Sequence, residues 1–292
     1  MNGLILLDKP QGYTSFKAAA VLRRIYGTKR VGHTGTLDPM ATGVLPILIG
    51  RATRLCSYVL EADKRYTAGV RLGITTDTLD ITGEVLSEST VSVSDEQLVD
   101  ALKHFTCTYD QIPPMFSAIK KDGVRLYDLA RQGKEIEREP RSITIHSIDL
   151  LRRDGHDFYI DVHCSKGTYI RSLADDIGKL LGCGATLISL RRTDAAGFSI
   201  TDCKTIEQIE ADPEGCLLSA DRAVPSFRSI NVSEAQAKRF LNGAALSVDR
   251  LRFVSNPTEK EIFKVFGDGH FLGLSEFDQL SNEISTKCVV FE

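Results

Sequence analysis

A single carboxylate in a glycine-rich loop is the side chain of this sequence best placed to do chemistry. Asp38 stands between an apolar residue and a proline in the run Gly32-His33-Thr34-Gly35-Thr36-Leu37-Asp38-Pro39-Met40-Ala41-Thr42-Gly43-Val44-Leu45-Pro46. The proline restricts the backbone beside the acid, and the glycines allow another molecule to approach closely. A carboxylate held in this way can act as a nucleophile or a general base. The alternative is a loop aspartate that only makes a turn with its own backbone.

The other patterns that could carry chemistry are incomplete. A Walker phosphate loop needs a hydroxyl directly after Gly-Lys, but the sequence has Gly133-Lys134-Glu135 and Gly178-Lys179-Leu180. The run Gly182-Cys183-Gly184 lacks the third glycine of a dinucleotide fingerprint and follows an expected helix. The six histidines show no metal-ligand spacing, and the seven cysteines contain no C-x-x-C pair. We therefore expect neither nucleotide hydrolysis nor hydride transfer, and no metal site.

The composition is typical of a globular protein. Hydrophobic residues make up 42% and charged residues 26% of the chain, which is enough apolar material for a packed core. The 292 residues suit one large and one small domain. No apolar run approaches the ~18 residues that span a bilayer, and the N-terminus lacks the basic flank and cleavage site of a secretion signal. We expect a cytoplasmic protein without membrane contact, and the odd number of scattered cysteines suits a reducing compartment.

Basic and acidic residues are concentrated in different segments of the chain, although the net charge is only −3. Residues 1–73 carry eleven Lys and Arg against four Asp and Glu, whereas residues 74–113 carry one against eight. A basic surface confined to one face can bind phosphate even when the whole protein is mildly acidic. On composition alone, however, two ordinary solvated faces explain the pattern more simply.

The elements around Asp38 mix strands and helices without strict alternation and without repeats, which favours an α+β fold. A strand over residues 3–7 leads into a helix with Ser15 as its N-cap and an end near Gly27. Ser94 and Gln97 form a capping box for a helix that ends near His104. The other elements expected in this half are a strand at 44–49, a helix at 52–60 and a strand at 66–72.

The second half contains an expected insertion and a domain boundary. Residues 115–141 are polar and basic, with a hairpin turn at Asp122-Gly123 and a short helix at 126–130. We place the domain boundary near Arg228. The remaining elements are strands at 142–151, 158–164 and 187–190, helices at 169–181 and 233–241, and short strands beyond.

Residues 32–46 meet in full the pattern G-H-x-G-x-L-D-P-x-A-x-G-x-L-P, and so resemble the catalytic loop of the tRNA pseudouridine synthase B family. Further blocks keep the family's order over roughly residues 2–195. These blocks are Leu7-Asp8-Lys9-Pro10 with Gly12 and Ser15, Asp63-Lys64-Arg65-Tyr66 with Leu72-Gly73, Ser117-Ala118, Ser165-Lys166-Gly167-Thr168-Tyr169-Ile170-Arg171 and Leu190-Arg191-Arg192-Thr193.

The resemblance implies an α+β pseudouridine synthase core with a mixed or antiparallel sheet over residues 1–228, carrying a thumb insertion at about 114–141. Residues 229–292, where the resemblance thins, fit a small β-rich domain like the PUA domain of many members. This segment carries seven basic and nine acidic residues, so we expect little help from it in binding RNA.

The implied activity is that of a cofactor-independent isomerase, which converts uridine to pseudouridine at the T-loop position of tRNA conventionally numbered 55. The reaction breaks the N-glycosidic bond, turns the base and rejoins it through carbon. By analogy Asp38 is the essential residue, and it either adds covalently to base or ribose or takes a ribose proton. Arg171 is implied to keep Asp38 ionised; the alternative is a helix-surface pair with Asp175 at i+4.

Five further residues match positions that surround the target base or support the loop. Tyr66 resembles a tyrosine that lies against the base and helps remove its C5 proton, and Tyr169 and Leu190 match residues that close the pocket by stacking or hydrogen bonding and by apolar contact. His33 resembles a histidine that contacts the region of the flipped nucleotide, and Lys9 is implied to order the loop from behind. By residue type alone, Tyr66 and Leu190 would be core residues and His33 merely exposed.

The implied partner is the T-arm stem-loop of tRNA, bound by a monomer without a guide RNA. Extruding a base costs a few kcal/mol, which contacts elsewhere must offset. The thumb is implied to close on the T arm, and the segment 126–133 matches the stand-alone bacterial members. The basic residues expected to contact phosphates are Arg23, Arg24, Lys29, Arg30, Arg51 and Arg54 in the N-terminal third and Lys120, Lys121, Arg125 and Arg131 in the insertion.

Two other functions compete with this interpretation. The first is an RNA-binding or tRNA-folding protein in which catalysis is secondary. The second is a glycosidase that uses Asp38 as a nucleophile, which would need a second carboxylate ~5–10 Å away. No second carboxylate is evident at the motif.

Overall fold

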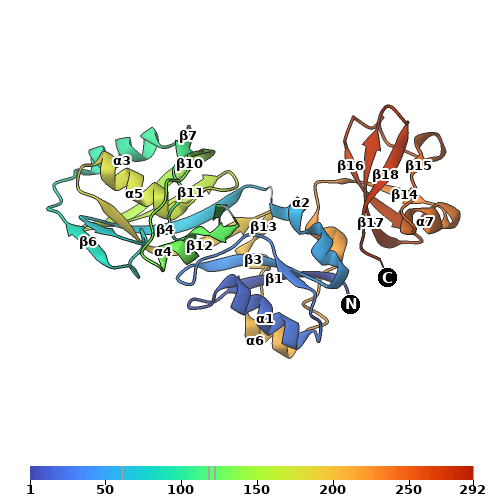
Figure 1. Cartoon of the computed structure of the whole chain (residues 1–292), viewed down its shortest axis with the longest axis horizontal. Helices are drawn as coiled ribbons and strands as arrows, with labels where there is room; N and C mark the ends of the chain where they lie inside the picture. The colour runs from blue at the N-terminus through green and yellow to red at the C-terminus, as the bar shows by residue number, and fades with distance from the viewer. Residues whose placement is uncertain (61, 118, 122, 292) are drawn as a thin grey trace.

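The computed structural model describes residues 1–60, 62–117, 119–121 and 123–291, with only the backbone at residues 60, 120, 121 and 125. A nine-stranded sheet forms the centre of the larger part of the chain (Figure 1). Its strands are β1 (Gly3–Lys9), β2 (Val31–His33), β3 (Thr42–Ile49), β4 (Lys64–Leu72), β7 (Thr108–Gln111), β10 (Arg141–Asp154), β11 (Asp157–Cys164), β12 (Ala185–Ala195) and β13 (Phe198–Ser199).

The sheet is mixed. Its strands follow the order β1-β3-β12-β4-β11-β10-β7, with β2 on β3 and β13 on β12. The pairing of β12 with β3 is parallel, and the other described pairs in this sheet are antiparallel. Helices α3 (Asp95–His104) and α5 (Ile170–Leu180) cover one half, while α1 (Ser15–Ile25) and α6 (Ile206–Ala211) lie beside β1 and β3 (Figure 1). The prediction of an α+β fold with a mixed sheet is confirmed.

Strand β1 is buried on both faces. Ile5 and Leu7 pack into the core beneath α1, whereas Leu4 and Leu6 pack into a second core that also contains Leu274. A strand without a solvated face reads as a continuous apolar run rather than as alternation. This explains the unbroken run of apolar residues that begins the sequence.

A second sheet occupies the C-terminal part of the chain, in the order β14-β16-β17-β18-β15 (Figure 1). Arg51 Nη1 donates to the Phe291 carbonyl at 2.7 Å, and Arg54 Nη1 donates to the Val289 carbonyl at 2.7 Å. Two arginines expected to contact phosphate thus hold the C-terminal segment against the larger part. The elements here are β14 (Arg228–Val232), α7 (Glu234–Leu241), β15 (Leu246–Ser247), η4 (Val248–Arg250), β16 (Ile262–Gly267), β17 (His270–Asp278) and β18 (Glu283–Val289).

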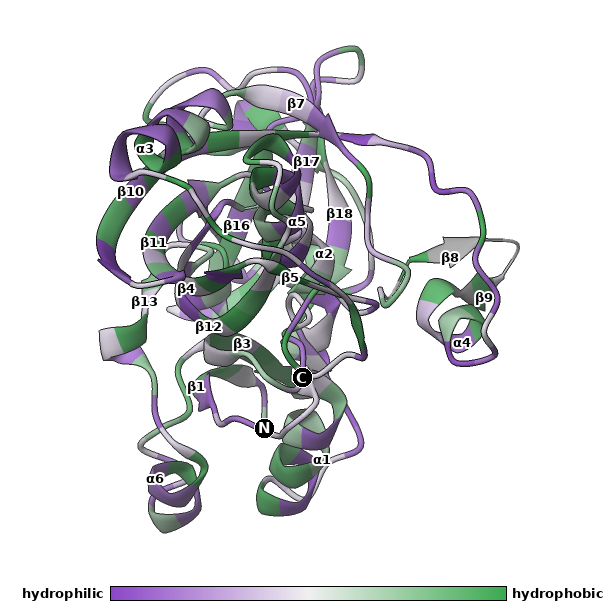
Figure 2. Cartoon of the chain, turned by 90° about the vertical axis from the view of Figure 1, so that its left-hand side faces the viewer, coloured by the Kyte–Doolittle hydropathy of each residue, from purple (hydrophilic) through white to green (hydrophobic). Residues whose placement is uncertain are grey.

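The segment between β7 and β10 projects from the body of the molecule (Figure 2). It contains the paired strands β8 (Lys120–Lys121) and β9 (Val124–Arg125) and the short helix α4 (Leu126–Ala130). The helix predicted at 126–130 is therefore confirmed. The predicted turn at Asp122-Gly123 includes residue 122, which lies outside the described residues, as do the side chains of Lys120, Lys121 and Arg125.

One local prediction was wrong. The N-cap of α1 is Thr14, whose side chain accepts from Lys17 N, because Ser15 is engaged with the loop that carries Asp38 instead. The helical segment predicted at 52–60 is confirmed, as a 3-10 helix, η1 (Gly50–Leu55), followed by the short helix α2 (Cys56–Leu60). The Ser94–Gln97 capping box is present as predicted. The remaining elements are β5 (Ile74–Thr76), β6 (Val85–Glu88), η2 (Ile200–Asp202) and η3 (Ala220–Ala223).

Of the helices in the described part of the chain, none has the length and apolar character needed to cross a bilayer.

Candidate active site

The loop that carries Asp38 connects β2 to β3. These strands pair antiparallel, so the chain leaves the sheet after His33 and returns at Thr42. The Asp38 carbonyl accepts from Ala41 N at 3.1 Å. Asp38 thus makes the turn expected of a loop aspartate through its backbone, which leaves its carboxylate available for another partner.

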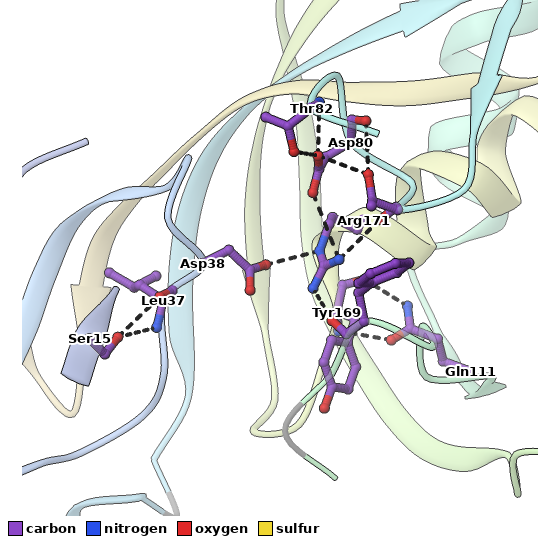
Figure 3. Close-up of polar contacts among 10 residues, drawn as sticks. Ser15, Leu37, Asp38, Asp80, Thr82, Gln111, Tyr169 and Arg171 are labelled. Atoms are coloured by element: carbon purple, nitrogen blue, oxygen red, sulfur yellow. Dashed lines mark hydrogen bonds and ion pairs between the residues drawn. The ribbon is translucent and has the colours of Figure 1, made fainter. Parts of the chain in front are cut away.

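The residues on both sides of Asp38 are anchored to the start of α1 and to the chain just before it. Ser15 Oγ accepts from Leu37 N at 2.8 Å and donates to Leu37 O at 3.1 Å (Figure 3). Gly12 N donates to Pro39 O at 2.8 Å. Since both neighbours of the acid are held, the backbone fixes the point from which the Asp38 side chain extends.

Lys9 directly precedes the turn that contains Gly12, and its side chain is fully buried. Its Nζ donates to Tyr13 O at 2.6 Å and to Pro10 O at 3.0 Å. Burial lowers the pKa of Lys9 to about 8, and the negative charge of Asp38 opposes that shift. The ammonium therefore binds the chain around Gly12, which in turn holds the loop that carries Asp38.

A second buried cation, Arg192 of β12, ties the two ends of the loop together. Its Nε donates to Val44 O at 2.7 Å and its Nη2 to Gly35 O at 3.2 Å. Gly43 lies against the backbone of this residue with a φ of +105°, and a Cβ at position 43 would stand 2.1 Å from the Arg192 carbonyl oxygen. Both the close approach and the left-handed backbone require glycine here.

The Asp38 carboxylate points at the guanidinium of Arg171, the second residue of α5 (Figure 3). Arg171 Nε lies 2.9 Å from Asp38 Oδ2; the arginine side chain is 5% exposed and the aspartate side chain 35%. Two further nitrogens of Arg171 donate to Thr78 O at 3.0 Å and Phe116 O at 2.8 Å. One buried cation thus joins the loop that carries Asp38 to two segments that are distant in sequence.

The alternative pairing of Arg171 with Asp175 is wrong. Asp175 Oδ2 lies 2.6 Å from Lys179 Nζ. Arg171 instead leaves the helix toward the interior, because residues on the buried stripe of α5 face the sheet and not the solvent.

A second carboxylate, Asp80, stands on the other side of Arg171 (Figure 3). Its Oδ2 lies 3.8 Å from Arg171 Nη1. Its Oδ1 accepts from Thr78 Oγ1 and Thr82 N, each at 3.0 Å, and from the Thr82 hydroxyl. Sequence reasoning found no second carboxylate, yet the fold supplies one. Asp80 is buried and satisfied by these donors, so it is placed to hold Arg171 and not to reach a substrate.

Asp38 opens into a cavity of about 260 Å³. This volume lies near the lower end of the range for small-molecule sites, ~300–1,000 Å³, and suits a ligand the size of one nucleobase. The residues that line it are Gly35, Thr36, Leu37, Asp38, Lys64, Tyr66, Ser117, Gly167, Thr168, Tyr169, Ile170, Arg171, Leu190 and Arg192.

Three of the predicted base-contacting residues share this lining with Asp38 and Arg171. Tyr66 and Leu190 come from the adjacent strands β4 and β12, and Tyr169 is the N-cap of α5. Burial raises the pKa of the Tyr66 hydroxyl, and the positive charge of Arg192 opposes that rise. The backbone of Tyr169 is fixed by Gln111, whose amide accepts from Tyr169 N at 2.8 Å and donates to Tyr169 O at 3.1 Å (Figure 3).

His33 and Lys9 are not among the described residues that line the cavity. His33 closes β2, and burial lowers its pKa, with the positive charges of Arg192 and Arg23 acting in the same direction. The ring is therefore neutral near pH 7. Its Nδ1 is buried without a hydrogen-bond partner among the described atoms.

The charge state of Asp38 is set by opposing influences. Burial raises the pKa of the carboxyl group above its ordinary value, and the nearby charge of Asp80 adds to the rise. The guanidinium of Arg171 lowers it, both by its charge and by its hydrogen bond, and Lys9 lowers it further. Arg171 therefore opposes burial as expected, but it does not bring the pKa back to that of a solvated carboxyl.

Asp38 is the one carboxylate among the described lining residues, and neither histidine nor cysteine lines the cavity with it. This donor set does not suit a transition-metal ion, which prefers several imidazole, thiolate or carboxylate ligands. The cavity presents one carboxylate bound to a buried guanidinium, two tyrosine rings and apolar side chains.

Some residues of the site were not predicted. Arg192 and Lys64 stood in recognised motifs without an assigned role, whereas Asp80 and Gln111 lay in an acidic segment that carried no motif. A buried arginine needs acceptors on several sides, so the prediction of Arg171 beside Asp38 could have prompted a search for a second acid.

Comparison with known proteins adds to this geometry. A family model described as "TruB family pseudouridylate synthase (N terminal domain)" matches residues 23–170, and one described as "tRNA pseudouridylate synthase B C-terminal domain" matches residues 171–223. The chain is 45% identical over 282 residues to the tRNA pseudouridine synthase B of Azoarcus sp., covering 95% of this chain and 91% of that protein. It is 42% identical to the protein of the same name from Clostridium perfringens, covering 96% of each.

Solved structures share the fold at lower identity. A Cbf5-Nop10-Gar1 complex contains a chain that superposes with a TM-score of 0.77 at 24% identity, covering 99% of this chain and 85% of the other. An H/ACA RNP bound to a substrate RNA containing 2'-deoxyuridine gives a TM-score of 0.76 at 22% identity with the same coverage.

Proposed function

Because the chain belongs to the TruB family of pseudouridylate synthases, we propose that Asp38 is the residue through which it isomerises the T-loop uridine of tRNA conventionally numbered 55. The chain is a tRNA pseudouridine synthase, an isomerase. One observation carries the proposal for Asp38. Its carboxylate stands at a cavity of nucleobase size and is bound at 2.9 Å by a buried guanidinium.

The reaction conserves all atoms and needs no oxidant. The bond between N1 of uracil and C1′ of ribose breaks, the base turns, and C5 bonds to C1′; C5 loses its proton and N1 gains one. Each route open to Asp38, covalent addition or removal of a ribose proton, begins with the ionised carboxylate. Arg171 favours that form, since a guanidinium stabilises the charged acid.

The other lining residues have roles that follow from their chemistry. Tyr66 presents a buried aromatic ring to the base, and its hydroxyl, which shares the cavity with the charge of Arg192, is the group that assists in removing the C5 proton. Tyr169 and Leu190 close the cavity around the extruded base. His33 contacts the neighbouring nucleotide region from outside the cavity, and Lys9 keeps the catalytic loop in place through the turn below it.

Binding of the T arm supplies the free energy that base extrusion requires. The thumb carries exposed cations, including Arg131 and Lys134, and projects from the body where it can close on a stem-loop (Figure 2). Among the N-terminal cations, Arg23 stacks over the Phe16 ring, 5.2 Å from its centroid. We propose that the chain acts as a monomer on tRNA without a guide RNA; the exposed cations of the thumb support this proposal.

A glycosidase is a weaker candidate. Among the described residues around Arg171, the second carboxylate is Asp80, which is buried, accepts from Thr78 Oγ1 and Thr82 N, and faces Arg171 Nη1 at 3.8 Å. Asp80 is not among the described residues that line the cavity, so it is not placed to protonate a leaving group there. The site therefore favours isomerisation within one nucleotide over hydrolysis.

The experiment uses unmodified tRNA and an isolated T-arm stem-loop, each incubated with the full chain in the presence of a metal chelator. Pseudouridine is mapped by mass spectrometry after chemical tagging. We expect one modified position, in the T loop, on both substrates. Modification at another position, or release of free uracil, would contradict the proposed substrate or the proposed chemistry.

A further inference from the structure

Two histidines and an aspartate meet on the face of the main sheet that turns away from α5. Along β11, Val162 and Cys164 point into the core beneath α5, so His163 between them lies on the opposite face. The pairing of β10 with β11 is irregular here, since Ile145 lies opposite Cys164 and Ser147 opposite His163. His146 is therefore the extra residue of a β-bulge, a device that re-aims side chains.

The bulge places the two imidazoles beside each other. The ring centroids of His146 and His163 are 4.7 Å apart. Asp63, which directly precedes β4, reaches both rings: its Oδ2 lies 3.2 Å from His146 Nε2 and 3.9 Å from His163 Nε2. All three residues are at least partly exposed, and one ligand atom of each lies within 4.8 Å of the others.

We propose that Asp63, His146 and His163 form a binding site for a single divalent transition-metal ion of the Zn²⁺ class. Two imidazoles and one carboxylate are borderline ligands of the kind Zn²⁺ prefers, and three protein ligands leave a fourth position for water. With metal–ligand bonds of ~2.0–2.2 Å, the ligand atoms of a tetrahedral site lie about 3.3 Å apart. The Asp63–His146 separation already matches this distance, and rotation of an exposed side chain shortens the Asp63–His163 separation by the small amount required.

The charges around the cluster are compatible with a cation. Arg65 lies opposite His163 in the register of β4 and β11, and its guanidinium is paired with Asp161. Lys64, the next residue after Asp63, also interacts electrostatically with that carboxylate. Asp194, opposite Arg65 in the register of β12 and β4, interacts electrostatically with His163 and adds negative charge. The site differs from the cavity that holds Asp38, whose lining lacks histidine.

A metal ion at this position would fasten the outer strands to the start of β4. Asp63 is adjacent in sequence to Lys64, which lines the cavity, while the two histidines belong to β10 and β11 (Figure 1). The ion would thereby add a cross-link between three segments that already share backbone hydrogen bonds, core packing and the Arg65–Asp161 ion pair. Ligand binding to the native state alone stabilises it by mass action.

The test is a calorimetric titration of the metal-free full chain with ZnCl₂ under reducing conditions, without RNA. We expect one ion per chain, and an affinity at least tenfold lower in each of Asp63→Asn, His146→Gln and His163→Gln. His104→Gln, a change at an exposed histidine of α3, is the matched control and should bind as the parent does. Equal affinity in all four variants, or no binding by the parent chain, would overturn the proposal.

A second measurement covers the case in which a variant folds poorly and guards against cysteine ligation. Co²⁺ added to the parent chain should give visible bands of a site with nitrogen and oxygen ligands, without a thiolate charge-transfer band. A thiolate band would assign the ion to the free cysteines and refute the site. Zn²⁺ should also raise the melting temperature of the parent chain and of His104→Gln. Because no RNA takes part, neither result depends on the proposed function.

Discussion

Replacement of Arg171 by lysine tests how the site keeps its acid in place. The guanidinium makes three directed contacts at once, to Asp38 Oδ2, Thr78 O and Phe116 O, at 2.9, 3.0 and 2.8 Å. A lysine ammonium keeps the positive charge but lacks the planar fork, so it cannot reproduce the three directions. The charge that balances Asp80 is retained, which limits the loss of stability.

The expected magnitude follows from the bond that is lost. A hydrogen bond to a charged group contributes about 1.5–3 kcal/mol, and each 1.36 kcal/mol corresponds to about tenfold in rate. Arg171→Lys should therefore reduce the rate of pseudouridine formation about 10- to 150-fold. Since Arg171 lowers the pKa of Asp38, the acid limb of the pH–rate profile should move to higher pH as the bond weakens.

The assay is single-turnover pseudouridine formation on the T-arm stem-loop, paired with a binding measurement on the same RNA. The matched control is Arg191→Lys, since Arg191 binds Asp8 through two contacts of 2.7 and 3.2 Å outside the cavity. We expect RNA affinity to change little in either variant. An equal loss of rate and affinity in Arg171→Lys, or an equal loss of rate in the control, would refute the assigned role.

Three further predictions concern a lining residue, the loop and the helix. Tyr66→Leu should retain RNA binding and lose turnover, as measured by the same two assays. Turnover equal to that of the parent chain would show that Tyr66 only packs in the core. Gly43→Ala should lower the free energy of unfolding by at least ~1–3 kcal/mol in urea titrations, because its Cβ would stand 2.1 Å from the Arg192 carbonyl oxygen; unchanged stability would refute the close approach. Burial raises the pKa of Asp176 to about 6, so the folded state binds a proton more tightly than the unfolded chain, and stability falls as pH rises from about 4 to 6. Asp176→Asn should therefore melt higher than the parent at pH 7.5, and the difference should disappear below pH ~4; a difference that is constant with pH would contradict this sign.

Local sequence patterns predicted the bounds of helices well where those bounds depend on residues close together in the sequence. The Ser94–Gln97 box begins α3 as expected, and the spacing of apolar residues placed α5 within one residue of its observed bounds. The N-cap of α1 was misplaced because Ser15 makes a tertiary contact with Leu37 that no local pattern contains. The sequence does not show which of the adjacent hydroxyl residues Thr14 and Ser15 caps the helix, because the tertiary partner of Ser15 cannot be seen in it.

The site was predictable only where a motif marks it. Asp38 follows from its loop, and Tyr66, Tyr169, Arg171 and Leu190 follow from family blocks; the fold brings all five to one cavity. Their roles stay predictions.

The partners of the buried arginines could not be predicted from spacing. Asp80 lies 91 residues from Arg171 in sequence and carries no motif of its own. Arg51 and Arg54 looked like phosphate ligands because a sequence shows charge but not which carbonyls a side chain will meet. The contacts of Arg51 and Arg54 depend on how the C-terminal sheet packs against the larger part of the chain.

The most direct test of the central claim is Asp38→Asn, which removes the ionisable group but keeps the size of the side chain and its backbone turn. Binding of unmodified tRNA and pseudouridine formation are measured on the same preparation. We predict tRNA affinity within about threefold of the parent chain and no detectable pseudouridine. Formation of pseudouridine at the parental rate would contradict the claim that this carboxylate performs the chemistry, and would favour an RNA-binding or RNA-folding protein whose catalysis lies elsewhere.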